Sequence, residues 1–239
     1  MKSNNLFKYD IAVIGLGYVG LPLMITAAKA EMKCLGIDIN HNTIESLNNN
    51  FSHIDRVTNN DLVISSDNLT FVDTYDHVSD AQTIVLCVPT PLKDGEPYTA
   101  YIESVMKGIT NHIKKEQLII LESTSYPQHT LTLSREIGES TNLKVGSDFY
   151  MCFSPEREDP GNQSWNTKTT PKVVGGITSV CTDKGYEFYK VFIDTVVKAK
   201  TSTSAELSKL LENTQRLINI AFMNEFKIIC EALEEDINH

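Results

Sequence analysis

The sequence predicts an α/β protein with a doubly wound parallel sheet, followed by one long helix. Short, wholly apolar runs alternate with segments of helical periodicity, and the C-terminal segment carries an uninterrupted helical pattern. The 239 residues are 41% hydrophobic and 22% charged, which is typical of a globular domain and provides enough apolar surface to offset chain entropy.

The apolar runs are predicted strands, because strands buried on both faces of a parallel sheet show continuous hydrophobic stretches. The predicted strands are 9–14, 33–37, 83–88, 118–121, 148–153 and 172–174. The predicted helices between them include 21–30, 101–114 and a segment around 181–192. This alternation is the pattern of a sheet covered by helices on both faces.

The C-terminal segment predicts a helix of unusual length. Thr203-x-x-Glu206 matches a capping box, and apolar residues from Leu207 to Leu233 recur at helical spacing. No Gly or Pro interrupts the segment through His239, so we expect a helix that leaves the sheet domain and has no stop signal.

Composition excludes several classes of function. The chain has 21 Lys and Arg against 31 Asp and Glu, a formal net charge of −10, which argues against a nucleic-acid partner. It has neither an apolar run long enough to span a membrane nor a signal-peptide core. The five cysteines form no C-x-x-C pair, so we expect reduced thiols in the cytoplasm and no metal site.

Residues 15–20 read G-L-G-Y-V-G and match G-x-G-x-x-G, between a predicted strand and a predicted helix. In a Rossmann unit Gly15 would make the tight turn and Gly17 would let the backbone approach a pyrophosphate. Gly20 would allow close helix packing, and the helix N-terminus would attract the phosphates. The alternative is a glycine-rich turn that only packs.

Asp38 ends the next predicted strand, where a carboxylate can accept hydrogen bonds from both ribose hydroxyls. It would repel a 2′-phosphate, and no Arg follows in 39–42, so the sequence favours NAD over NADP. The predicted domains are an NAD-binding Rossmann domain at 1–200 and the start of a helical domain at 201–239.

Three further polar segments are candidate parts of the site. Residues 88–91 and 122–125 follow predicted strands and could line the crevice at the carboxyl ends, although both also suit ordinary turns. The charged segment 153–161 could hold an anionic, hydroxylated substrate or form a solvated loop.

Lys209, Asn213 and Arg216 share one face of the predicted long helix. Such a polar stripe either contributes to a site or faces solvent.

These motifs together resemble the family of UDP-glucose, GDP-mannose and UDP-N-acetylhexosamine dehydrogenases. The resemblance extends from about residue 9 to 231 and rests on GLGYVGLP, CVPTPL, ESTS, FSPEREDPGN, PKVVGG and AELSKLLENTQRLINIAFMNE. SPEREDPGN is most similar to the N-acetylated branch and favours UDP-N-acetylglucosamine 6-dehydrogenases of surface-polysaccharide biosynthesis. UDP-glucose enzymes carry an acidic residue where Pro160 stands here.

The resemblance implies a role for each residue that matches a family motif. The implied cofactor contacts are Gly15, Gly17, Tyr18, Val19, Gly20, Asp38, Thr90 and Thr124. The implied sugar-nucleotide contacts are Arg157, Glu158, Lys209, Asn213 and Arg216. The implied catalytic residues are Lys209, Asn213, Glu156 and Thr124. Lys209 and Asn213 would suit a developing oxyanion, because a cation and an amide donor both stabilise negative charge.

The implied reaction is a double oxidation at C6 of a UDP-N-acetyl sugar. The alcohol loses a hydride to NAD, a cysteine captures the aldehyde, and a second hydride leaves before hydrolysis to a uronic acid. In the family that cysteine lies in a glycine-rich segment that would follow His239, ahead of a UDP-binding domain. We therefore expect a truncated chain that binds NAD, cannot complete turnover, and forms a homodimer through its last helix.

Two alternatives stay open. Another Rossmann dehydrogenase, of the UDP-glucose, hydroxyacid or 6-phosphogluconate type, would share the sheet and a following long helix. A non-catalytic NAD-binding module would use the helix to hold a partner.

Overall fold

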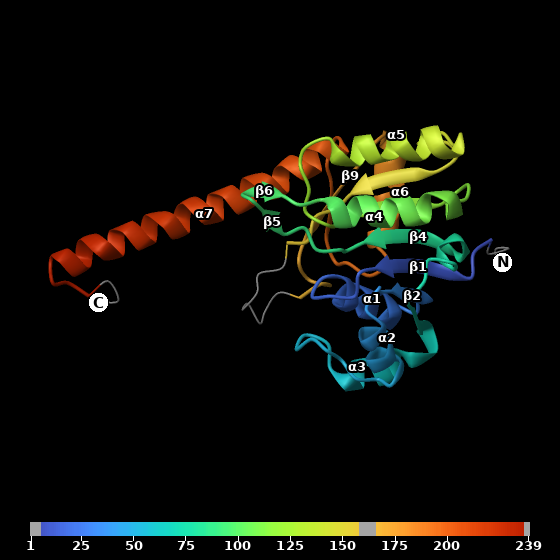
Figure 1. Cartoon of the computed structure of the whole chain (residues 1–239), viewed down its shortest axis with the longest axis horizontal. Coiled ribbons are helices and arrows are strands. Elements are labelled where there is room, and N and C mark those ends of the chain that lie inside the picture. The colour runs from blue at the N-terminus through green and yellow to red at the C-terminus, as the bar shows by residue number, and fades with distance from the viewer. Residues whose placement is uncertain (1–5, 158–165, 237–239) are drawn as a thin grey trace.

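A computed structural model describes residues 6–157 and 166–236, and shows a layered domain from which one helix projects (Figure 1). The eight-stranded sheet has the order β10-β9-β8-β7-β4-β1-β2-β3. Its strands are β1 (Tyr9–Ile14), β2 (Cys34–Ile37), β3 (Leu69–Val72), β4 (Ala81–Leu86), β7 (Leu118–Leu121), β8 (Tyr150–Phe153), β9 (Lys172–Gly176) and β10 (Val196–Lys198). A separate antiparallel hairpin consists of β5 (Leu92–Lys93) and β6 (Glu96–Pro97).

The six strands β3-β2-β1-β4-β7-β8 are parallel, which confirms the predicted fold class. Their order is that of two mononucleotide-binding halves joined at β1. β9 pairs antiparallel with β8 and β10 pairs parallel with β9, so the two strands at this edge run against the rest. This reversal brings Lys172, the first residue of β9, to the carboxyl edge of the parallel strands.

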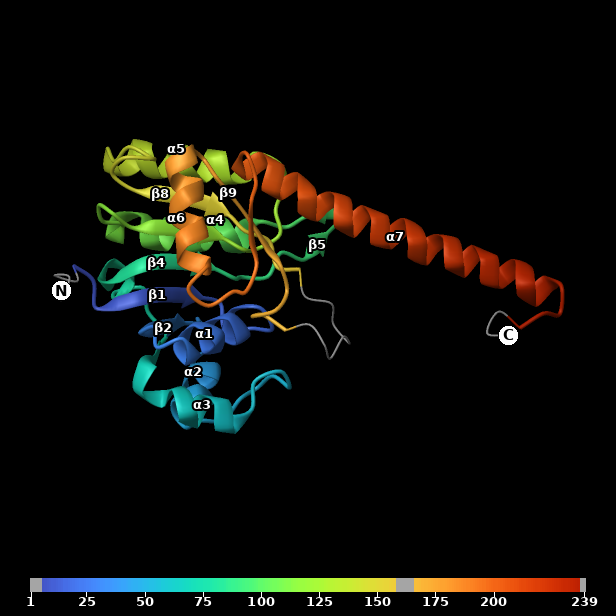
Figure 2. The ribbon, with the colours of Figure 1, turned by 180° about the vertical axis from the view of Figure 1, so that it is seen from behind.

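Helices cover both faces of the sheet. They are α1 (Gly20–Lys29), α2 (His41–Asn48), α3 (Asn59–Ser65), α4 (Ala100–Ile109), α5 (His129–Thr141), α6 (Ser179–Tyr189) and α7 (Ser202–Ala232), with short 3₁₀ turns at Ser66–Asn68, Val78–Asp80 and Thr110–His112. α1, α2, α3 and α6 contribute to one core cluster, and α4, α5 and the first turns of α7 contribute to the other. Figure 2 shows α1 and α6 on the side opposite to α4 and α5 of Figure 1.

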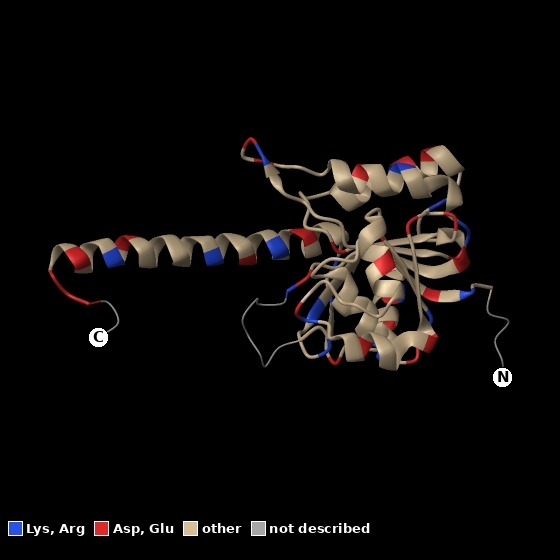
Figure 3. Cartoon of the chain, turned by 60° about the horizontal axis from the view of Figure 1, so that its bottom comes forward, with Lys and Arg blue, Asp and Glu red and all other residues tan. Residues whose placement is uncertain are grey.

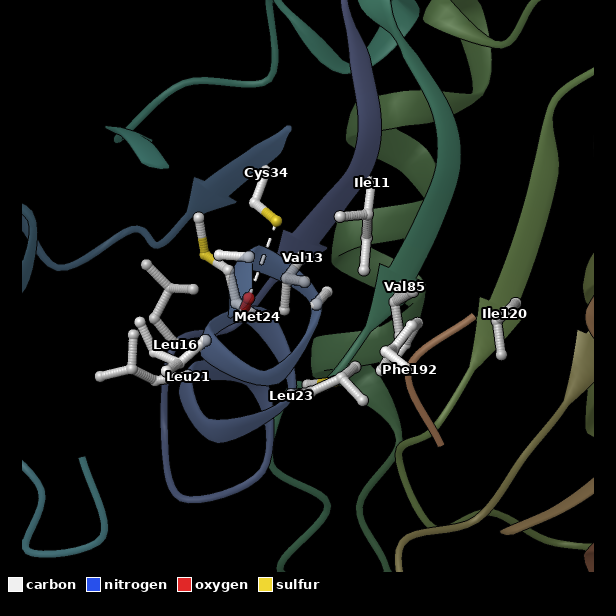
Figure 4. Close-up of a cluster of buried hydrophobic side chains, with 14 of the residues drawn as sticks. Ile11, Val13, Leu16, Leu21, Leu23, Met24, Cys34, Val85, Ile120 and Phe192 are labelled. Atoms are coloured by element: carbon white, nitrogen blue, oxygen red, sulfur yellow. Dashed lines mark hydrogen bonds between the residues drawn. The ribbon is translucent and has the colours of Figure 1, made fainter. Parts of the chain in front are cut away.

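The core between α1 and the sheet is built from alternate residues of the central strands (Figure 4). Ile11 and Val13 of β1 are fully buried there beside Met24 of α1. The Cys34 thiol donates a 3.7 Å hydrogen bond to the Met24 carbonyl oxygen. The side chains that alternate with them in β1, such as Ile14, belong to the core on the opposite face, so both sides of the strand are apolar.

Short polar side chains begin several helices by accepting hydrogen bonds from exposed backbone amides. The Asn40 side chain caps α2, and Thr58 forms a capping box with Asp61 at α3. Thr178 caps α6. These local signals fix where the chain turns from strand or loop into helix.

Two expectations about α7 are wrong. Its N-cap is Thr201, which accepts from the Ser204 amide, and Glu206 makes its hydrogen bonds to another element. The helix ends at Ala232, and Glu234 follows in the left-handed region at φ 61°, so the helix does not continue to His239. Residues 237–239 lie outside the described part.

Among the described residues, the buried part of α7 lies in its first two turns. Ser202, Ala205 and Glu206 are buried, whereas nearly every residue beyond Glu212 is exposed. Within the described ranges, no helix combines the length and apolar character that spanning a bilayer requires.

Candidate functional site

A glycine turn connects β1 to α1 at the carboxyl edge of the sheet. Gly15 has φ +92°, and a Cβ there would lie 2.8 Å from the Cys87 carbonyl oxygen. A Cβ on Gly20 would lie 1.9 Å from the Gly15 carbonyl oxygen, so the helix packs directly on the turn. A Cβ on Gly17 would meet nothing within 4 Å, which leaves this backbone open to a ligand.

Asp38 follows β2 at the same edge and is half-buried. Its Oδ2 accepts a 2.9 Å hydrogen bond from the Leu16 amide, and its Oδ1 accepts one of 2.9 Å from the Asn40 amide. These two contacts hold the carboxylate against the glycine turn. Asp38 lines the cavity described next, where its remaining lone pairs can accept hydrogen bonds from ribose hydroxyls.

A cavity of about 780 Å³ lies along this edge of the sheet. One end is lined by Gly15, Gly17, Tyr18, Val19 and Asp38. The other end is lined by residues that follow β4, β7 and β8, including Thr90, Thr124 and Glu156. The cavity therefore crosses β1, the point where the strand order reverses and open α/β sheets bind dinucleotides.

The predicted polar segments after β4 and β7 come together at the second end. The Ser123 hydroxyl donates a 2.7 Å hydrogen bond to the Val88 carbonyl oxygen and so joins the two loops. Val88, Thr90 and Thr124 line the cavity. Ser125 does not: it is hydrogen-bonded to His129 at the start of α5.

Cys87 also lines the cavity, which the sequence analysis did not anticipate. Burial, reinforced by the Glu122 carboxylate, raises the pKa of its thiol well above the ordinary value. A thiol held protonated in this way is a poor nucleophile. Cys87 therefore contributes a buried thiol to the cavity wall.

Lys209 of α7 reaches the loop that follows β8. Its Nζ donates a 2.5 Å hydrogen bond to the carbonyl oxygen of Glu156. Burial lowers the pKa of the Lys209 ammonium, and the carboxylates of Glu156 and Glu212 oppose that change. Lys209 thus lies beside the cavity without lining it.

The other predicted substrate residues are placed differently. Arg157 forms a bidentate ion pair with Glu212 of α7, through both Nε and Nη2. Asn213 and Arg216 are exposed on the same face of α7, beyond the cavity. Glu158 lies outside the described residues.

Sequence reasoning missed a buried ionic cluster beneath the second end of the cavity. Lys172 Nζ lies 3.0 Å from Glu122 Oε1 and 3.5 Å from Glu156 Oε2. The Tyr189 hydroxyl of α6 also donates to Glu122. The available signal was Lys172 itself, a charge at the start of an otherwise apolar strand, but its partners are far away in the chain.

The described residues fit a bound dinucleotide. The open backbone at Gly17 and the α1 N-terminus can receive a diphosphate, and Asp38 can accept the ribose hydroxyls. In the part of the chain that the structure describes, no group of His, Cys, Asp and Glu side chains forms a metal site.

The fold and this cavity define an NAD-binding domain of the dehydrogenase class. The chain belongs to the UDP-glucose/GDP-mannose dehydrogenase family: residues 9–193 match its NAD binding domain and residues 203–239 match its central domain.

Relatives and solved structures agree with this family. The chain is 32% identical to a UDP-N-acetyl-D-mannosamine dehydrogenase of Pyrococcus horikoshii over 224 residues, covering 92% of this chain and 53% of that protein. It is 33% identical to the Escherichia coli K12 enzyme of that name over 234 residues, covering 92% and 54%.

The solved structure of the Pyrococcus horikoshii enzyme superposes with a TM-score of 0.88 at 31% identity, over 93% of this chain and 54% of that one. A UDP-N-acetyl-mannosamine dehydrogenase of Staphylococcus aureus gives 0.84 at 32% identity, over 93% and 55%. The chain thus spans about half the length of these relatives.

Proposed function

We propose that this chain supplies the NAD side, and part of the sugar side, of a dehydrogenase that oxidises C6 of a UDP-N-acetylhexosamine. The observation that carries the proposal is a continuous cavity that joins the glycine turn and Asp38 to the polar ends of β4, β7 and β8. The product of the proposed oxidation, a uronic acid, suits surface-polysaccharide biosynthesis. We also propose that the protein lies in the cytoplasm.

The N-acetylated class is supported by two solved relatives named for UDP-N-acetylmannosamine and one named for an NDP-N-acetyl-galactosaminuronic acid. The motif SPEREDPGN favoured UDP-N-acetylglucosamine. Because the relatives described above are UDP-N-acetyl-D-mannosamine dehydrogenases, UDP-N-acetylmannosamine is the first sugar nucleotide to test and its gluco epimer the second.

The proposed residue roles are those that the family resemblance implies; the cavity lining supports Thr90, Thr124 and Glu156, whereas Lys209 and Asn213 lie on α7 outside that lining. When bound, NAD accepts a hydride from the sugar carbon. Thr90 and Thr124 flank the nicotinamide end, and Glu156 orients the reacting group. Lys209, whose pKa is lowered by burial, takes up the hydroxyl proton and with Asn213 stabilises the developing oxyanion.

Arg157, Glu158 and Arg216 complete the proposed contacts to the sugar nucleotide. Since Arg157 is paired with Glu212, the substrate anion would have to share or displace that carboxylate.

We also propose that these 239 residues bind NAD without completing both oxidations, because none of their five cysteines lies in a glycine-rich segment like the one that carries the family's nucleophile. The proposed domains are 1–200 for the cofactor and 201–239 for the start of a helical domain. The proposed assembly is a homodimer through α7, whose apolar side chains Leu217, Ile218, Phe222 and Phe226 are 45 to 67% exposed.

Calorimetric titration of the purified chain tests the cofactor. We expect NAD to bind and NADP to bind at least about tenfold more weakly, because a 2′-phosphate meets the Asp38 carboxylate. The Asp38→Ala variant should lose this preference for NAD. The Asp73→Ala variant should keep it, because Asp73 is an exposed carboxylate paired with His41. Absence of NAD binding would overturn the proposal.

Titration of the NAD complex with UDP-N-acetylmannosamine, UDP-N-acetylglucosamine and UDP-glucose tests the sugar. Binding of an N-acetylated sugar nucleotide in preference to UDP-glucose supports the proposed substrate class, and binding of UDP-glucose alone would contradict it. Light scattering tests the dimer: Phe222→Glu should yield a monomer, and Leu92→Glu on the β5–β6 hairpin should not.

A further inference from the structure

The charged residues that line the cavity are all acidic. Among the described residues they are Asp38 at the glycine-turn end, and Glu122 and Glu156 at the other end. No described lysine or arginine lines the cavity, although the expected ligand carries a negatively charged diphosphate. The backbone amides at the α1 N-terminus suit the diphosphate, so the two acids at the far end require another explanation.

Those two acids belong to one ionic cluster with Lys172 and Tyr189. Lys172 Nζ lies 3.0 Å from Glu122 Oε1 and 3.5 Å from Glu156 Oε2, and its ammonium stands 5.1 Å from the centre of the Tyr189 ring. The side chains of Glu122, Lys172 and Glu156 are 0%, 5% and 21% exposed. Two carboxylates therefore share the buried Lys172 ammonium, and Glu156 also interacts electrostatically with the Lys209 ammonium.

The ionised form of Glu122 is supported by its partners. The Lys172 ammonium and the Tyr189 hydroxyl both donate to Oε1, and Oε2 has no hydrogen-bond partner among the described residues. Burial by itself lowers the pKa of Lys172, but the carboxylates of Glu122 and Glu156 outweigh that effect and raise it. Burial also raises the pKa of the Glu122 carboxyl, and the Lys172 ammonium and the Tyr189 hydroxyl oppose that change.

Two further cations, Lys209 and Arg157, lie near this cluster. Lys209 Nζ donates to the backbone carbonyl oxygen of Glu156 and, like Lys172, does not line the cavity. Arg157 is paired with Glu212. The acidic side chains therefore lie nearer to the ligand space than the cations that balance them.

The topology identifies which part of the cofactor lies at this end. Asp38 follows β2 on one side of β1, and Glu122 and Glu156 follow β7 and β8 on the other side. With the ribose of the adenosine half at Asp38 and the diphosphate over β1, the nicotinamide ring falls at the ends of β4 and β7. The ring is positively charged in NAD⁺ and neutral in NADH.

We propose that Glu122, together with Glu156, makes this site discriminate between the two redox forms of the cofactor in favour of the oxidised ring. A buried carboxylate attracts the nicotinamide cation and gains nothing from the neutral dihydronicotinamide. The diphosphate is the same in both forms, so its repulsion by the acids cancels from the ratio of the two affinities. The inference rests on the NAD site assigned above, and it adds a role for two residues in loading substrate cofactor and releasing product cofactor.

The test compares dissociation constants for NAD⁺, NADH and ADP-ribose in wild type and Glu122→Gln, a nearly isosteric change that removes the charge. Calorimetry measures NAD⁺ and ADP-ribose, and cofactor fluorescence measures NADH. We expect the ratio Kd(NADH)/Kd(NAD⁺) to fall by about three- to tenfold, with ADP-ribose, which lacks the ring, unchanged. Glu103→Gln is the matched control, because it removes an exposed carboxylate from α4, whose neighbour Ser104 lines the cavity.

An unchanged ratio in Glu122→Gln would overturn the inference, as would an equal loss of ADP-ribose affinity, which would move the effect away from the ring. If circular dichroism shows that Glu122→Gln does not fold, Glu156→Gln carries the same expected shift and the same contrary outcome. Failure of the wild-type chain to bind either cofactor is a different result, because it removes the NAD site itself.

Discussion

The carboxylate of Glu206, in the first turns of α7, caps α5 by accepting hydrogen bonds from the Thr130 amide at 2.9 Å and from the Thr130 hydroxyl at 2.6 Å. It also accepts from the Gln128 amide at 2.6 Å. Gln128 is the N-cap residue of α5 but provides no side-chain cap of its own. One helix therefore completes the N-terminus of another, and this contact sets where α7 leaves the domain (Figure 1).

Replacing Glu206 with Ala should lower the free energy of unfolding by about 2–4 kcal/mol, because three donors, two of them on the buried Thr130, lose a charged acceptor. Urea denaturation measures this change. The matched control is Glu225→Ala, an exposed residue of the same helix, which should change stability by less than about 0.5 kcal/mol. Equal effects of the two substitutions would contradict the capping role.

Gly17→Ala and Gly20→Ala should fail in different ways. A methyl at Gly17 enters open space, so the variant should fold normally but bind NAD at least about tenfold more weakly, because the backbone can no longer approach the diphosphate. A methyl at Gly20 collides with the Gly15 carbonyl oxygen and should lower the free energy of unfolding by about 3 kcal/mol or more. Thermal melts and calorimetry separate the two effects, and a stable Gly20→Ala variant would contradict the packing.

Lys209 should lose its proton at a lower pH than an ordinary lysine. Burial lowers the pKa of its ammonium from 10.5, and the Glu156 carboxylate acts in the opposite direction. NMR of ¹³C-labelled lysine, assigned with Lys209→Met, measures the titration. Glu156→Gln should lower the pKa further, and a wild-type titration at or above 10.5 would contradict the burial of this group.

Acid should destabilise the domain through His129. Burial lowers the pKa of His129 from 6.5, so between its folded pKa and about 6.5 the unfolded chain binds a proton that the folded chain does not. Stability is therefore lost as pH falls through that window. We expect His129→Gln to reduce the loss of unfolding free energy between pH 7.5 and 5.5, as measured by urea denaturation.

His41 provides a control of opposite sign. Its hydrogen bond to Asp73 raises its pKa, so it adds stability below its unfolded pKa and loses that stability as pH rises through the folded pKa. His41→Gln should therefore enlarge the loss on acidification. If both variants changed the pH dependence of the unfolding free energy in the same direction, opposite pKa shifts of the two histidines could not be the cause.

Helix α7 shows which features the local sequence pattern predicts and which it does not. Figure 3 shows a long helix with separated charged bands and much uncharged surface, as its sequence indicates. The apolar spacing predicted the helix because neighbouring residues alone determine that period. Its N-cap was wrong by two residues, since Thr203-x-x-Glu206 has the letters of a capping box while Glu206 is bound to α5.

The sequence by itself determined the features that depend on adjacent residues. β1 and β7 have the predicted bounds because continuous apolar runs identify strands buried on both faces. The glycine turn and Asp38 were predictable because a fixed spacing places them at the ends of β1 and β2. The strands β3 and β10 were not predicted; both are short and only partly buried, so their apolar signal is weak.

Only the tertiary structure decided what lies around that turn. The reversal of β9 brings Lys172 to Glu122 and Glu156, and the docking of α7 brings Glu212 to Arg157 and Glu206 to Thr130. The partners in these pairs are separated by at least 16 residues in the chain. Such contacts depend on how strands are ordered and helices are packed, and no local period or spacing encodes that choice.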